Sequence, residues 1–189
     1  MDEIVFFLEE YSAEVMLEGF LPKLLPKQVQ YRCIVFEGKQ DLDGQIVKRM
    51  RGYRVPNTRF VVLRDQDLGD CKIIKKELAK KCSEAGHPNS LIRIACHELE
   101  SWYLADLSAV EKGLGLSNLA RKYQNKKPFS LPDSSHRPAQ MLKKIASSYQ
   151  KIGGSRSIGP HLNPKNKRSR SFAVFVEGLK KLCSSSLDQ

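Results

Sequence analysis

A continuous apolar run near the start of the chain, IVFFL at residues 4–8, ends in the acidic pair Glu9-Glu10. The run is short, rich in β-favouring residues and bounded by charge, which is typical of a strand buried on both faces of a parallel sheet. Similar runs occur at residues 29–36, 59–63 and 91–95. The run RFVVL at 59–63 also ends in acids, because Arg64-Asp65-Gln66-Asp67 follows it. These runs predict four strands, two of which end in carboxylates.

Segments with helical spacing separate the predicted strands. Apolar residues recur at this spacing in residues 15–20, 42–50 and 71–85. Ser12 is the expected N-cap of the first helix, and Asp70 is the expected N-cap of the third. Strands that alternate with helices of about a dozen residues predict an α/β fold. The expected sheet is mostly parallel, four-stranded and flanked by helices.

The pattern loosens after residue 107, where prolines and glycines become frequent. A capping-box sequence at Ser108–Glu111 predicts one short helix, and helical spacing predicts two more over residues 139–149 and 171–182. Residues 151–170 are expected to form a flexible loop. We therefore divide the chain into an α/β domain at 1–107 and a basic, mostly helical extension at 108–189 that packs on the same domain.

Charge is distributed unevenly along the chain. Residues 1–111 carry 16 Lys/Arg and 18 Asp/Glu, a net charge of −2, whereas residues 112–189 carry 16 and 3, a net charge of +13. Such asymmetry indicates a surface for nucleic acid, although a solvated basic face that aids solubility is the alternative. The basic stretch before the last helix supplies the expected phosphate contacts: Arg156, Lys165, Lys167, Arg168 and Arg170.

Other features limit the class of protein. We expect no secretory signal, because the sequence begins Met1-Asp2-Glu3 without a basic n-region. No apolar stretch reaches membrane-spanning length, and the five cysteines form no zinc-type spacing. We therefore expect a cytoplasmic protein with free thiols and no membrane association. Residues Gly153–Arg156 lack the GK[ST] core of a Walker A motif, which argues against ATP hydrolysis by this chain.

The acids at the strand ends point to a metal site. Glu9 follows the first predicted strand, and Asp65 and Asp67 follow the third. Ligands bind at the carboxyl ends of strands in an open parallel sheet, so these side chains are expected at one edge. If the backbone stays extended, Asp65 and Asp67 point to the same side, about 6.5–7 Å apart. Carboxylate oxygens suit Mg²⁺ or Mn²⁺.

A second acidic segment follows the fourth predicted strand and contains Glu98, Glu100 and Asp106. If this segment is helical, Glu98 and Glu100 lie about 200° apart and cannot face one metal, whereas in an extended backbone they can. Asp70 is a further candidate ligand, although its position before a helix also suits a cap. The candidate metal ligands are therefore Glu9, Asp65, Asp67, Asp70, Glu98 and Glu100.

A strand ending in glutamate, followed by a later strand ending in Asp-x-Asp, resembles the Toprim domain of topoisomerases, primases and OLD-type nucleases. The resemblance covers residues 1–107 and implies that Glu9, Asp65 and Asp67 form a metal-dependent catalytic core. Toprim proteins commonly have glycine where this chain has Glu10, so the first ligand is Glu9 or Glu10, and we favour Glu9 because it directly ends the apolar run. The strings at residues 8–14, 65–70 and 98–106 also resemble a family of small, uncharacterised Toprim-like bacterial proteins. That resemblance implies a partner ATPase of the ABC or AAA type and a role in phage defence.

Two functions follow from these observations. The first is a metal-dependent phosphodiesterase, a nuclease, in which Glu9, Asp65 and Asp67 hold Mg²⁺ or Mn²⁺ beside bound nucleic acid. The second is a non-catalytic Toprim-like subunit that binds nucleic acid or nucleotide and regulates a partner ATPase. A phosphoacceptor receiver domain also gathers acids at strand ends, but it needs a lysine after a later strand, where this chain has only Arg93 within the fourth predicted strand.

Overall fold

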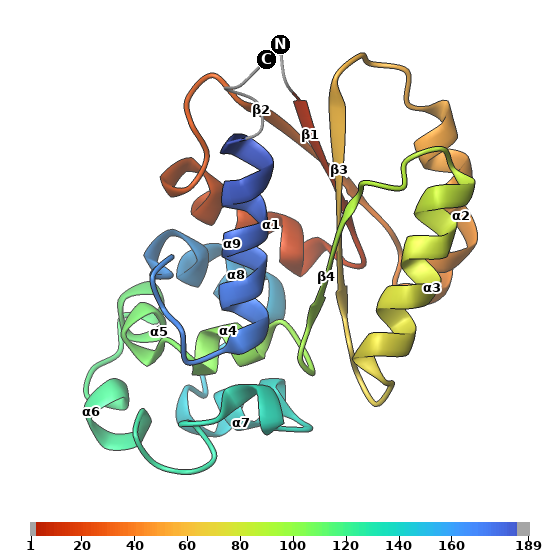
Figure 1. Cartoon of the computed structure of the whole chain (residues 1–189). Coiled ribbons are helices and arrows are strands. Elements are labelled where there is room, and N and C mark those ends of the chain that lie inside the picture. The colour runs from red at the N-terminus through yellow and green to blue at the C-terminus, as the bar shows by residue number, and fades with distance from the viewer. Residues whose placement is uncertain (1–2, 185–189) are drawn as a thin grey trace.

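A parallel sheet forms the centre of the computed structural model, which describes residues 3–184. Its strands are β1 (Glu3–Leu8), β2 (Gln30–Val35), β3 (Thr58–Asp65) and β4 (Leu91–Ala95), in the order β2-β1-β3-β4 (Figure 1). All neighbouring strands pair in parallel. The predicted α/β class and four-stranded sheet are confirmed, and the sheet is wholly parallel.

Both faces of the sheet are covered by helices, which explains the continuous apolar run at its centre. Successive side chains of β1 point to opposite faces, so Phe6 and Leu8 join one apolar cluster while Val5 and Phe7 join another. All four of these side chains are fully buried. A strand buried in this way needs apolar residues at every position, not at alternate positions.

One face is covered by α2 (Lys39–Gly52) and α3 (Cys71–Glu84), which lie together in Figure 1. Each helix buries one stripe: Leu42, Ile46 and Met50 from α2, and Ile74, Leu78 and Cys82 from α3. The spacing of these residues by four is the amphipathic pattern visible in the sequence.

The other face is covered by α1 (Tyr11–Phe20) and by elements from the C-terminal half. These elements are α4 (Glu100–Leu104), α5 (Leu107–Leu114), α6 (Leu119–Tyr123), α7 (Pro138–Ile145), α8 (Lys151–Ile158) and α9 (Arg170–Ser184), with 3-10 turns η2 (Pro132–Ser134) and η3 (Gly159–His161). A further 3-10 turn, η1 (Leu21–Lys23), directly follows α1. One apolar cluster contains Phe6 of β1, Trp102 of α4 and Phe172 of α9. The described part of residues 108–189 therefore shares its core with the sheet.

The prediction of a flexible loop over residues 151–170 is wrong for its first half, which folds into α8 and η3. Its glycines serve close packing. A Cβ at Gly154 would meet the Tyr149 ring at 2.4 Å, and a Cβ at Gly159 would meet the Met16 backbone oxygen at 2.4 Å. The helix predicted over 139–149 is also shorter, because α7 ends at Ile145.

Two predicted caps differ from the structure. The N-cap of α1 is Glu10, and the Ser12 hydroxyl instead donates a hydrogen bond to the Glu10 carboxylate. The helix expected from the capping box begins earlier, with Asp106 as the N-cap of α5. Within residues 3–184, none of the helices is long and apolar enough to span a bilayer.

Candidate metal centre

The candidate site lies where the strand order changes direction. β1 is flanked by β2 on one side and β3 on the other, which makes its carboxyl end the switch point of the sheet. Leu8 pairs with Leu63, so Glu9 and Asp65 leave neighbouring strands at nearly the same level. The chain thus brings together two acids that are 56 residues apart in sequence.

Glu9 is held directly against β3. Its Oε2 accepts a hydrogen bond from the Asp65 backbone amide at 3.0 Å, and its own amide donates to the Leu63 carbonyl. Its side chain is 14% exposed. Burial raises the pKa of Glu9, and the neighbouring Asp67 carboxylate raises it further, although the Asp65 amide opposes both effects. The ionised form of Glu9 is therefore less favourable in the folded protein than in water.

Asp65 faces several other carboxylates. Burial raises its pKa well above the usual range, and the charges of Glu10, Glu100 and Glu9 add to this effect, while the Lys151 ammonium opposes it. Like charges this close disfavour ionisation unless a cation or a proton joins them. Four carboxylates, two after β1, one at the end of β3 and one in α4, thus form one electrostatic unit, which we call the carboxylate cluster (Glu9, Glu10, Asp65 and Glu100).

Glu100 is the most deeply buried member of the carboxylate cluster. It is 1% exposed, and its Oε1 accepts a hydrogen bond from the Tyr149 hydroxyl at 2.8 Å. Its Oε2 is buried without a hydrogen-bond partner. Burial raises the pKa of Glu100, and the Tyr149 hydrogen bond and the Lys151 charge work against that rise. A buried carboxylate oxygen without a partner is stabilised by a proton or by a bound cation.

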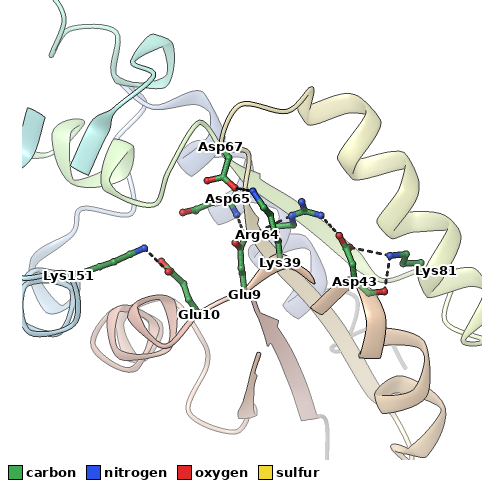
Figure 2. Close-up of polar contacts among 9 residues, drawn as sticks. All are labelled: Glu9, Glu10, Lys39, Asp43, Arg64, Asp65, Asp67, Lys81 and Lys151. Carbon is green, nitrogen blue, oxygen red and sulfur yellow. Dashed lines mark hydrogen bonds and ion pairs between the residues drawn. The ribbon is translucent and has the colours of Figure 1, made fainter. Parts of the chain in front are cut away.

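Glu10 connects the cluster to α8. Its Oε2 lies 2.6 Å from the Lys151 ammonium, and its Oε1 accepts from Ser12 at 2.6 Å (Figure 2). Sequence reasoning missed Lys151, because a stretch rich in glycine and serine gives no helical signal. It missed Tyr149 because the hydrogen bond of Tyr149 to Glu100 joins residues 49 positions apart in sequence.

Asp67 has different surroundings from Asp65. The extended backbone that would point both side chains the same way is not present, because β3 ends at Asp65 and Asp67 adopts a left-handed conformation with φ of 53°. The Asp67 carboxylate pairs with the Lys39 ammonium at 2.7 Å. Its backbone is fixed by His97, whose carbonyl accepts from the Asp67 amide at 2.8 Å and whose Nδ1 lies 2.7 Å from the Asp67 carbonyl.

Three further acids have structural contacts. Asp70 caps α3, since its Oδ1 accepts from the amides of Lys72 at 2.7 Å and Ile73 at 3.2 Å. Glu98 lies before α4 and accepts from the Ala139 amide in the first turn of α7 at 2.8 Å. Asp106 caps α5 and also accepts from the Asn163 amide at 2.8 Å. Glu98 and Glu100, two candidates in one segment, thus have separate partners.

Arg64 turns to the opposite face of the sheet from Asp65. Its Nη1 lies 2.9 Å from Asp43 of α2, which also pairs with Lys81 of α3 at 3.2 Å (Figure 2). Its Nε lies 3.9 Å from the Glu9 carboxylate. Arg64 thus fixes the end of β3 from behind the carboxylate cluster.

The predicted phosphate contacts divide into two groups. Arg156 of α8 donates to the Tyr11 hydroxyl at 3.2 Å, next to Glu10 and the carboxylate cluster. Lys165, Lys167 and Arg168 are exposed in the segment between η3 and α9, and Arg170 is the exposed first residue of α9.

The comparison with known protein families gave a match over most of the chain, including the candidate site. The sequence model of the family described as Domain of unknown function (DUF4276) matches residues 8–180. The chain belongs to the DUF4276 family. The matched region of this DUF4276 protein includes the carboxylate cluster and α8. No curated protein and no solved structure matched the chain.

The donor set of the DUF4276 protein suits a hard divalent cation. Among residues 3–184, no three or more His, Cys, Asp or Glu side chains lie together in an arrangement that could hold a metal ion. Lys39 and Lys151 instead supply the cations that face Asp67 and Glu10. The cluster nevertheless offers oxygen ligands only, and the unpartnered Oε2 of Glu100 lies among them. This chemistry fits Mg²⁺ or Mn²⁺.

Proposed function

We propose that this DUF4276 protein is a metal-dependent phosphodiesterase with a Toprim-like fold that cleaves nucleic acid. One observation carries the proposal: the Glu9 carboxylate accepts from the Asp65 amide at the switch point, beside a buried Glu100 oxygen that has no partner. Buried carboxylates whose pKa values are raised by burial and by neighbouring charges are common at functional sites.

In this proposal Glu9 and Asp65 are the principal ligands of Mg²⁺ or Mn²⁺. Glu10 and Glu100 are the candidates for the remaining ligands because their charges act on Asp65, and Asp67 is a further candidate because its charge acts on Glu9. A bound divalent ion would supply a water of lowered pKa and positive charge for the leaving oxygen. Asp70 and Glu98 are not metal ligands in this proposal, because their carboxylates accept hydrogen bonds from the backbone amides of Lys72 in α3 and Ala139 in α7.

Two lysines flank the carboxylates and suit the phosphate group. Lys151 reaches Glu10 from α8, and Lys39 reaches Asp67 from α2. Their side chains are 51% and 47% exposed, so both ammonium groups also face solvent. Once a divalent ion neutralises the carboxylates, each ammonium can turn to a phosphate oxygen as a point charge.

Nucleic acid is the favoured class of phosphodiester. The chain carries a formal net charge of +11, and the positive charge is concentrated after residue 111. A surface of this kind attracts a polyanion much more strongly than it attracts a small phosphodiester.

A second candidate is a non-catalytic nucleic-acid-binding or nucleotide-binding subunit. The ion pairs Lys39–Asp67 and Lys151–Glu10 favour it, because they neutralise part of the acidic site without metal. The partner ATPase and the defence role that the Toprim-like resemblance implies remain predictions under either candidate.

The test compares cleavage by wild-type protein with cleavage by an Asp65→Asn variant. Supercoiled plasmid and single-stranded DNA are incubated with Mg²⁺ or Mn²⁺, with EDTA as the blank. Glu77→Gln, which neutralises an exposed carboxylate on α3, is the matched control. We expect wild type and Glu77→Gln to cleave equally and Asp65→Asn to be inactive while its circular dichroism is unchanged.

Two outcomes would overturn the enzymatic proposal. Equal cleavage by Asp65→Asn and wild type would trace the activity to another site or to a contaminant. The absence of cleavage with either metal would remove the phosphodiesterase, and DNA binding that persists in EDTA would then support the non-catalytic candidate.

A further inference from the structure

Two exposed basic segments from different parts of the C-terminal half lie side by side. The first runs from α6 into the following loop, and the second precedes α9. Together they form what we call the basic ridge, composed of Arg121, Lys122, Lys126, Lys127, Lys165, Lys167 and Arg168, all of which are exposed. The four residues of the first segment were not among the predicted phosphate contacts.

A hydrogen bond joins the two segments of the basic ridge. Arg168 donates from Nη2 to the Asn125 Oδ1 at 3.0 Å, across 43 residues of sequence. Asn125 lies between Lys122 and Lys126, so this contact brings the charges of both segments to one surface. Figure 1 shows α6 at the end of the molecule toward which the strands run. That end also carries the carboxylate cluster.

The second segment is held in place by its own asparagines. The Asn163 amide donates to Asp106, and the Asn163 side chain accepts from the Lys165 amide at 2.9 Å. Asn166 donates to the Ala105 carbonyl at 2.8 Å and accepts from the Arg168 amide at 2.9 Å. Basic side chains on an ordered loop bind with a smaller entropy cost than side chains on a mobile loop.

The two segments of the basic ridge contain no acid of their own, and the carboxylate of the neighbouring Glu111 accepts from the Ala120 amide of α6. Asp133 is the single acid between residues 112 and 176, and its carboxylate accepts from the Ser171 amide. By contrast, the lysines of α3 share their helix with Glu77 and Glu84, and Lys80 pairs with Glu84. Uncompensated charge on neighbouring segments indicates a polyanionic partner.

The apolar residues of this region favour a nucleic-acid backbone over a membrane or unstacked bases. Leu119 and Phe129 are buried, and Leu131, which is 56% exposed, lies outside α6, so α6 presents no apolar helix face of the kind that inserts into lipid. Tyr123 packs against Phe129, and Lys122 lies over its ring at 5.0 Å. Because this ring is covered, the ridge offers charge for phosphates but no stacking platform for bases.

We propose that the basic ridge binds the phosphate backbone of double-stranded nucleic acid outside the carboxylate cluster. The inference rests on the proposed function only in taking nucleic acid as the ligand. The ridge would hold the duplex while the carboxylate cluster acts on a bond, so binding should survive the loss of cleavage.

The test measures the affinity for a DNA duplex in EDTA as a function of salt concentration. The ridge variant carries Arg121→Gln, Lys122→Gln, Lys126→Gln and Lys127→Gln. The control variant removes the same amount of charge from exposed positions of α2 and α3, by Lys48→Gln, Arg49→Gln, Lys75→Gln and Lys76→Gln. Each phosphate contact contributes about 0.9 to the slope of log K against log salt, so the slope should fall by about 2–3.5 in the ridge variant and by much less in the control.

A charge-neutral variant tests the ordered loop. Asn166→Ala should weaken duplex binding by about two- to tenfold with an unchanged salt slope, because it removes order and not charge. Asp65→Asn should bind the duplex like wild type in EDTA. This result separates the two proposals, since a failure of cleavage leaves ridge binding intact.

Three results would overturn the inference. The first is an equal loss of slope in the ridge and control variants, which would mean that only net charge matters. The second is an unchanged slope in the ridge variant. The third is tighter binding to vesicles of phosphatidylcholine and phosphatidylserine, or to single-stranded DNA of equal length, than to the duplex.

Discussion

Glu100→Gln should make the metal-free protein more stable. The glutamine keeps an oxygen that can accept from the Tyr149 hydroxyl, and it replaces the unpartnered Oε2 with an NH₂ group. That group can donate toward Asp65, whose carboxylate faces Glu100. The substitution thus removes a buried charge and supplies a missing donor while leaving the shape of the side chain almost unchanged.

The size of the effect follows from the burial of the oxygen. A buried polar group without a partner costs about 1–3 kcal/mol. For a domain of this size, 1 kcal/mol shifts the melting temperature by about 2–4 °C, so Glu100→Gln should raise Tm by about 2–12 °C in EDTA at neutral pH. Tyr149→Phe should act in the opposite direction, by about 1.5–3 kcal/mol, because it removes the hydrogen bond to a buried charged group.

The difference between wild type and Glu100→Gln should depend on pH. Burial raises the pKa of Glu100 above its ordinary 4.5, so the folded state takes up the proton at a higher pH than the unfolded state does. Wild-type stability therefore increases as pH falls through the raised pKa, and the electrostatic penalty is absent once both states are protonated. The variant's amide does not titrate, so its advantage should be largest at neutral pH and should shrink toward pH 4.5.

Thermal denaturation in EDTA, from neutral pH down to about pH 4.5, measures the difference in Tm between wild type and Glu100→Gln. A second series with added Mn²⁺ measures how much the metal stabilises each protein. Mn²⁺ should raise the Tm of wild type more than that of Glu100→Gln, since ligands that bind the folded state stabilise it. A variant that is less stable than wild type at neutral pH, or a stability difference that does not change with pH, would refute the reasoning about the buried oxygen.

Three further predictions separate structural acids from ligands. Asp70→Ala should lower the free energy of unfolding by about 1 kcal/mol through loss of the α3 cap, measured by urea denaturation, and a loss of Mn²⁺ affinity would contradict this role. Glu98→Gln, which keeps an acceptor for the Ala139 amide, should leave cleavage and Mn²⁺ binding unchanged, and a tenfold drop in either would make Glu98 a ligand. Mn²⁺ affinity, measured by calorimetry, should fall as pH decreases through the raised pKa of Asp65 and should respond less to pH in Asp65→Asn; an identical pH response in both would exclude Asp65 as the titrating ligand.

The four strands could be predicted from the sequence, since their apolar runs are local signals. IVFFL is buried on both faces, and burial on both faces requires the continuous apolar run that is visible in the sequence. The shared position of Glu9 and Asp65 followed as well, because parallel strands place their carboxyl ends at one edge. The role of Asp70 as a helix N-cap could also be predicted, because the residue directly precedes a segment with helical spacing.

The rest of the site depends on tertiary contacts that leave no local pattern. Glu98 and Glu100 are two residues apart, yet one accepts from the Ala139 amide and the other from the Tyr149 hydroxyl, according to which helix packs nearby. Lys151 reaches Glu10 only because α8 packs closely, with Gly154 against Tyr149 and Gly159 against Met16. Glycines weaken a helix considered alone, so the sequence predicted a loop where close packing stabilises a helix. Local propensity and strand order therefore set the sheet and its acidic edge, whereas the partners of each acid were set by packing between segments distant in sequence.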